Sequence, residues 1–167
     1  MLDEDPIEEA RQQWVAQGWE AAAPGVALIG SLVRTQQIFV RRLERELRPL
    51  ELSLARFEVL MQLTFSRNGS MPLGRMRKRL QVAPGAITNS IDRLEKDGLV
   101  RRQSDAADGR VTIASITRNG RIRGLEAAKI VNERVYENLE LNPELVDSLI
   151  DQLRVIRGHA GDFRSSH

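Results

Sequence analysis

The sequence contains no cysteine and only two histidines among its 167 residues. The absence of cysteine excludes disulfides, thiolate metal sites, cysteine nucleophiles and cysteine redox switches. Both histidines, His159 and His167, stand in the polar C-terminal tail, which argues against a histidine-rich metal site and against a histidine general base. We therefore expect neither a metal ion nor a cofactor.

Motifs of catalysis and of membrane targeting are missing as well. The sequence has no P-loop, no dinucleotide fingerprint, no G-x-S-x-G and no H-E-x-x-H. No apolar run approaches the length that spans a membrane, and the acidic segment MLDEDPIEE does not resemble a signal peptide. These absences predict a cytoplasmic protein that is not an enzyme and has no membrane partner.

Positive charge is concentrated in the middle of the chain. Residues 67–123 contain 13 lysines and arginines against 5 acidic residues, whereas the rest of the chain contains 12 and 18. The formal net charge of +2 therefore conceals a local charge of +8. A basic segment attracts nucleic-acid phosphates, although a charge run by itself is more often a solvated face.

Residues 73–117 have the order of elements that is typical of a winged helix-turn-helix. A basic helix is expected over 73–80, a second helix over 84–97, and a β-hairpin over 99–116 with its tip at 105–110. The second helix would fit the major groove of DNA, and an arginine on the thin hairpin can reach the minor groove. The pattern therefore predicts a DNA-binding unit.

The remaining chain is expected to be helical, with apolar residues recurring every three or four positions. These helices cover residues 6–20, 26–47, 54–66, 118–139 and a last stretch capped by Asn142, and Pro24 with Gly25 marks a break. The fold class is thus mainly α with a small β-wing. The apolar stripe of 26–47 is too broad for one small winged domain to cover, so dimerisation is the economical interpretation.

Four regions follow from this pattern. We expect an N-terminal extension helix in residues 1–25, a helical dimerisation region formed by 26–50 and 118–160, a winged helix-turn-helix domain over 53–117, and a tail over 161–167.

The outer face of the helix over 84–97 is expected to read DNA. Its start is small, which permits close approach, and the polar residues that follow can bond to base edges or phosphates. The expected contact residues are Pro84, Gly85, Ala86, Thr88, Asn89 and Arg93.

The alternative is an ordinary surface helix with ion pairs four residues apart. These pairs would join Asp92 to Lys96 and Arg93 to Asp97. We favour DNA contact for Thr88 and Asn89, and the ion-pair interpretation for Asp92, Lys96 and Asp97.

The hairpin tip contains Asp108-Gly109-Arg110. An aspartate beside an arginine can hold the guanidinium in one orientation through a forked pair. Arg110 would then enter the narrow minor groove, where the negative potential is enhanced. The alternative is a plain Asp-Gly turn with an exposed arginine.

Two stretches carry a resemblance to a known family. Arg102, Asp105, Asp108 and Arg110, followed by Val111 and Thr117, resemble the wing signature of the multiple antibiotic resistance regulator (MarR) family, and AITNSIDRLEKDGLVRR resembles the end of its recognition helix. The resemblance covers about 26–158. It implies a winged helix-turn-helix homodimer that binds double-stranded DNA at a pseudo-palindromic operator and whose repression a small molecule relieves.

Carried over by position, the resemblance places Thr88, Asn89 and Arg93 on the recognition helix and Asp108 and Arg110 on the wing. Arg75 and Arg102 complete the residues expected to contact DNA. Ala83-Pro84-Gly85 departs from the family pattern, in which many members have serines at this start, and so puts the usual hydroxyl contacts in doubt.

The N-terminal segment DPIEEARQQWVAQGW is similar to the extra first helix of the urate- and aconitate-responsive branch of that family. The resemblance implies that Trp14, with Trp19 second, borders a pocket for a small, anionic or aromatic ligand. The alternative is that both tryptophans anchor the extra helix. For the whole protein, the alternative function is a winged-helix module that binds protein and recognises no operator.

Overall fold

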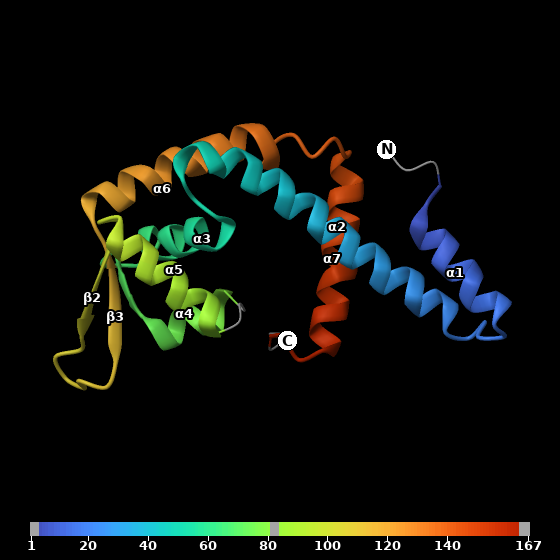
Figure 1. Cartoon of the computed structure of the whole chain (residues 1–167), viewed down its shortest axis with the longest axis horizontal. Helices are drawn as coiled ribbons and strands as arrows, with labels where there is room; N and C mark the ends of the chain where they lie inside the picture. The colour runs from blue at the N-terminus through green and yellow to red at the C-terminus, as the bar shows by residue number, and fades with distance from the viewer. Residues whose placement is uncertain (1–3, 81–83, 164–167) are drawn as a thin grey trace.

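The computed structural model describes residues 4–80 and 84–163, with the backbone alone for residues 84–86. A winged unit, formed by the elements between Leu54 and Ile116, lies at one end of the molecule, and helices extend from it toward the other end, where the N-terminal helix lies (Figure 1). The elements in chain order are α1 (Pro6–Ala16), α2 (Ala23–Leu47), a 3₁₀ turn (Arg48–Leu50), α3 (Leu54–Thr64), β1 (Ser70–Pro72), α4 (Leu73–Leu80), α5 (Pro84–Lys96), β2 (Val100–Ser104), β3 (Thr112–Ile116), α6 (Arg118–Val131), a π-helical turn (Asn132–Tyr136) and α7 (Pro143–His159).

Side-chain caps determine where several helices begin. The first amide groups of a helix have no partner within it, so a preceding polar side chain stabilises the start. The Asp5 carboxylate accepts from the Ile7 N–H at 3.0 Å, and the Thr117 hydroxyl accepts from the Gly120 N–H at 3.0 Å. Ser53 and Asn142 cap α3 and α7 in the same way, and the cap by Asn142 confirms the one that the sequence predicts.

The three strands form an antiparallel sheet in the order β1-β3-β2. The hairpin of β2 and β3 has the expected place, with Arg102 opposite Ala114, and β1 pairs with the other side of β3. Strand β1 was not among the expected elements, because three residues are too few to show an alternating pattern.

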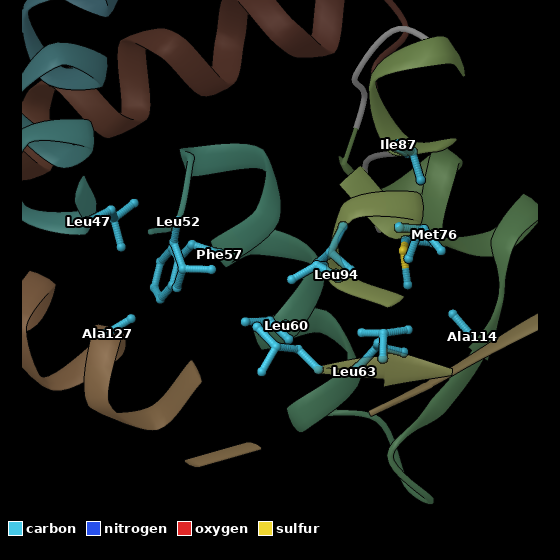
Figure 2. Packing of buried hydrophobic residues seen from close by; sticks show 14 of the residues in the cluster. Leu47, Leu52, Phe57, Leu60, Leu63, Met76, Ile87, Leu94, Ala114 and Ala127 are labelled. Atoms are coloured by element: carbon cyan, nitrogen blue, oxygen red, sulfur yellow. The ribbon is translucent and has the colours of Figure 1, made fainter. Parts of the chain in front are cut away.

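The core of the winged unit lies between α3, α5, α6 and the sheet (Figure 2). Ile87, Ile91 and Leu94 of α5 are buried, which confirms the expected inner face of that helix. Met76 of α4 is fully buried, while the arginines and the lysine of that helix face solvent. The helix-turn-helix is thus held rigidly against a packed interior.

Two expected boundaries near the N-terminus are wrong. Helix α1 ends at Ala16 rather than near residue 20, since Gly18 adopts a φ of +79° that stops the helix. The expected break at Pro24 is instead the first turn of α2, which begins at Ala23. Proline fits there because amide groups in a first turn need no helical partner.

The expected helix over 118–139 is also divided. Helix α6 ends at Val131 and continues as a π-helical turn to Tyr136, which buries Val135. The apolar periodicity did not reveal the change from α to π geometry, because the buried residues Val131 and Val135 stand four positions apart, a spacing that an ordinary α-helix accommodates as well.

Helices α2 and α7 expose broad apolar faces. Ile29 and Val33 of α2 and Ile150 of α7 have exposed fractions of 64%, 50% and 48%. Between the two helices lies a hollow of about 380 Å³, whose walls include Leu32, Phe39, Leu149 and Leu153.

Candidate nucleic-acid interface

Helix α5 presents a polar outer face above its buried apolar stripe. Ser90 is buried with that stripe, Thr88 is half-buried, and Asn89, Asp92 and Arg93 are exposed. The exposed set can donate and accept hydrogen bonds, as contact with base edges requires. The expected contact residues Thr88, Asn89 and Arg93 therefore lie together on about one turn and a half of helix.

Helix α5 is the second helix of the helix-turn-helix, and its described residues begin at Pro84. Pro84, Gly85 and Ala86 form the first helical residues, and Ala83 before them lies outside the described residues. The Nη2 of Arg77 on α4 lies 3.2 Å from the Thr88 hydroxyl, which accepts its hydrogen bond. This contact joins the two helices at the solvent side. Arg75 lies exposed near the beginning of α4.

The tip of the wing is ordered by two aspartates. One carboxylate oxygen of Asp105 accepts from the amides of Ala107 at 2.7 Å and Asp108 at 3.1 Å. The Arg110 guanidinium forks onto Asp108, with Nε to Oδ1 at 3.1 Å and Nη2 to Oδ2 at 3.4 Å. The expected forked pair is confirmed. The Arg110 side chain is nevertheless 92% exposed, so the orientation is fixed while the cation remains accessible.

Hydrogen bonds from the Arg110 side chain and, next, from its backbone lower the pKa of the Asp108 carboxyl. The carboxylate therefore stays ionised at neutral pH, and the fork keeps its charge-assisted character.

Two acidic residues, Asp92 of α5 and Asp97 directly after it, pair with other elements rather than along the helix, which corrects the expected pairs four residues apart. Asp92 accepts from Arg102 of β2, and Asp97 pairs with Arg56 of α3. Arg102, expected to contact DNA, also pairs with Glu95, its Nη2 lying 2.6 Å from Oε2. Sequence reasoning missed Glu95 and Arg56, since their partners lie too far along the chain for any local pattern.

A hollow of about 420 Å³ lies beside the exposed face of α5. Its walls are Ser53 and Arg56 from the start of α3 and Asn89, Ser90, Asp92 and Arg93 from α5. Two of the three charged residues in this wall are arginines. The side of α5 is therefore accessible to an anionic group next to Asn89.

The two tryptophans lie at the corner between α1 and α2. Their rings meet edge to face, with centroids 5.8 Å apart and planes at 65°. Ile7 of α1 packs on Gly30 of α2, where an added Cβ would lie 2.9 Å from its Cδ1. Figure 1 shows α1 at the end of α2 that is remote from the winged unit. Within one chain, Trp14 and Trp19 thus lie away from the helix-turn-helix.

Another hollow, of about 500 Å³, lies between the winged unit and the end of α6. Its lining includes Phe57 and Met61 of α3, Phe65 directly after α3, Arg79 of α4 and Tyr136 of the π-helical turn. Glu58 faces this hollow too, and burial raises the pKa of its carboxyl. Burial, and then the charge of Glu58, raise the pKa of Tyr136.

Among the residues that the structure describes, no three histidine or acidic side chains are placed to hold a metal ion together. Within the same ranges, no helix has both the length and the apolar character to cross a membrane.

Comparison with known proteins gives consistent matches. Residues 52–112 match the model of the MarR family. The crystal structure of Sco5413, a MarR family transcriptional regulator from Streptomyces coelicolor, has a TM-score of 0.77 and 33% identity, covering 85% of this chain and 99% of that one. A MarR variant from Escherichia coli complexed with operator DNA has a TM-score of 0.69 and 26% identity, covering 77% of this chain and 92% of that one.

A curated relative matches over a shorter stretch. The transcriptional repressor MdtR from Bacillus subtilis is 33% identical over 60 residues, which are 36% of this chain and 39% of that protein. The chain spans less than two thirds of the length of the curated relatives that it matches.

Proposed function

Because this chain belongs to the MarR family, we propose that it is a sequence-specific DNA-binding regulator of transcription, active as a homodimer and released from DNA by a small ligand. The observation that carries the proposal is that one rigid unit exposes two elements that can contact DNA, namely α5 and the wing. Helix α5 presents Asn89 and Arg93, and the wing presents the forked Arg110. Such elements suit the major and the minor groove.

A second copy of the chain accounts for the apolar faces of α2 and α7. Apolar surface of this extent on two long helices is typical of an interface that another protein covers. A twofold dimer would place two copies of α5 about one DNA turn apart, which matches a pseudo-palindromic operator. The expectation of a dimerisation region over 26–50 and 118–160 is retained in this proposal.

The hollow between the winged unit and α6 is the site that we propose for the effector. Its aromatic and apolar walls, together with Arg79, suit a small aromatic molecule that carries an anionic group. A ligand there would contact both the DNA-binding unit and the helices of the dimer. A shift of one against the other changes the spacing of the two copies of α5. A coupling of roughly 1–3 kcal/mol would be ordinary, which is about 5–150-fold in affinity.

The test begins by selecting duplexes from a random-sequence pool with the purified full chain. We expect one sequence with twofold symmetry to be enriched, to be bound by one dimer, and to lose affinity steeply as salt rises. The control is a scrambled duplex of equal length and composition. Equal binding of both duplexes at every salt concentration would contradict operator recognition and favour the protein-interaction alternative.

The effector proposal has its own test. A panel of small aromatic carboxylates is titrated into the complex with the selected duplex, and release is followed by fluorescence anisotropy. Arg79→Ala should weaken release by the active compounds. Arg118→Ala, an exposed arginine at the start of α6, is the matched control. Equal release from Arg79→Ala and the parent would remove this hollow as the effector site.

A further inference from the structure

Arg102 of β2 donates three hydrogen bonds to two carboxylates of α5. Its backbone N–H donates to Glu95 Oε1 at 2.8 Å, and its Nε donates to Glu95 Oε2 at 2.8 Å. Its Nη1 donates to Asp92 Oδ1. One residue of the wing is thereby attached to one turn of the recognition helix, since residues three apart share a helix face.

The place of β2 in the sheet explains the backbone contact. β2 is an outer strand, because β3 lies in the middle of the sheet. An outer strand has alternate N–H groups that point away from its neighbour and need another acceptor. Glu95 supplies that acceptor for Arg102, so the carboxylate holds the strand through its main chain as well as its side chain.

The charges favour the same arrangement. Asp92 and Glu95 would lie close to DNA phosphates, where carboxylates are unfavourable. Hydrogen bonds from the Arg102 side chain, and next from its backbone, lower the pKa of Glu95, so that Glu95 stays ionised and the pair is kept at neutral pH. Both carboxylates are partly shielded by the same cation, and a phosphate would have to displace them to reach it.

We infer that Arg102 is a positioning residue, not a phosphate contact: with Glu95 and Asp92 it fixes the wing at one angle to α5, so that Arg110 and the α5 side chains meet the two grooves together. The inference rests on the proposed DNA-binding function. Its consequence is that the cluster contributes to operator affinity through geometry. Binding to random-sequence DNA needs no matched placement of the wing and α5, so loss of the cluster should leave that affinity nearly unchanged.

Glu95→Gln gives the sharpest test, because the two interpretations predict opposite signs. Removing a negative charge from a DNA-facing helix should leave binding unchanged or strengthen it if Arg102 acts on phosphate. If Arg102 positions the wing, Glu95→Gln should weaken binding to the selected duplex about threefold or more, the size of ordinary coupling within one ion-pair network, and leave binding to the scrambled duplex unchanged or slightly stronger.

A double-mutant cycle combines Glu95→Gln with Arg102→Ala and with the double variant that carries both changes. Arg102→Lys is measured beside it. We expect the losses of affinity for the selected duplex in the two single variants not to add in the double variant. Lysine should not restore affinity, because it cannot make a forked pair with a carboxylate. The dependence of binding on salt should keep the slope of the parent. A slope smaller by about one, with equal loss on both duplexes, is the behaviour of a phosphate contact and would overturn the inference.

Arg101→Ala is the matched control, since it removes the same charge from the next position of β2, on the opposite face of the strand. We expect it to change binding to the two duplexes by equal factors. Circular dichroism and thermal melts confirm that each variant is folded. Should the parent itself fail to distinguish the two duplexes, the proposed function fails. A discriminating parent together with an unaffected or tighter Glu95→Gln overturns only the inference.

Discussion

Arg110 and Asp108 form a forked ion pair at the tip of the wing, with Nε to Oδ1 at 3.1 Å and Nη2 to Oδ2 at 3.4 Å. The same Asp108 oxygen accepts the Arg110 backbone N–H at 3.1 Å. The aspartate therefore fixes both the turn and the direction of the guanidinium, while most of the arginine stays exposed. An exposed cation that is already oriented loses little conformational entropy when it binds.

Arg110→Ala should weaken binding to the selected and to the scrambled duplex, because the role that we propose for the arginine in the minor groove depends mainly on its charge. The salt slope should fall by about one. Fluorescence anisotropy over a series of salt concentrations measures both effects. Arg110→Lys keeps the charge without the fork, so we expect it to restore binding to the scrambled duplex more fully than binding to the selected one. If the salt slope of Arg110→Ala equals that of the parent, Arg110 does not contact DNA in the minor groove.

Asn89→Ala should act on sequence preference. An asparagine on the outer face of α5 can pair with adenine in the major groove, and its loss costs roughly 1–3 kcal/mol at one base pair. A set of duplexes with single substitutions across the operator should show relaxed preference at one position of each half-site. Lys96→Ala, on the exposed side of the same helix, serves as the control. Equal loss on all duplexes would make Asn89 a backbone contact.

Sequence patterns located most of this fold, for physical reasons that particular elements illustrate. Helix α4 runs over Leu73–Leu80 as expected, because its apolar residues recur at helical spacing. The wing pair was predictable because both partners lie within three residues. Glu95 with Arg102 and Arg56 with Asp97 were not, since only the fold brings these pairs together.

Gly120→Ala should be strongly destabilising. Gly120 is buried near the start of α6, and a Cβ there would lie 2.0 Å from the Leu99 carbonyl oxygen. That oxygen belongs to the backbone, which cannot move without disturbing the beginning of β2, so we expect a loss of about 2–3 kcal/mol. Thermal melts of Gly124→Ala provide the comparison. Its Cβ would lie 3.3 Å from the nearest atom, a side-chain carbon of Leu60, and the gain in helix propensity offsets that contact.

Glu58→Gln should stabilise the protein at neutral pH and not at acid pH. Burial raises the pKa of Glu58 in the folded state. The folded chain thus binds its proton more tightly than the unfolded chain, and stability falls as pH rises between the unfolded and the folded pKa. Glutamine removes that dependence. In thermal melts between pH 4 and pH 8, the melting temperature of Glu58→Gln should therefore rise above that of the parent as the pH increases. The control is Glu44→Gln, which changes an exposed glutamate of α2. Parallel curves would contradict burial as the cause.

Trp14→Ala should loosen α1 without changing DNA affinity. The edge-to-face contact with Trp19 is worth about 1 kcal/mol, and α1 lies at the end of α2 remote from the winged unit (Figure 1). Proteolysis within residues 17–22 and the fluorescence of Trp19 report the loosening. Gly30→Leu, which crowds Ile7 from the other side, should loosen α1 equally while it keeps both indoles. Weaker ligand release in Trp14→Ala than in Gly30→Leu would support the tryptophan as an effector contact, whereas equal release in both variants would leave it an anchor. A loss of DNA affinity like that of Arg110→Ala would mean instead that α1 acts on a winged unit, which must then be that of a second copy.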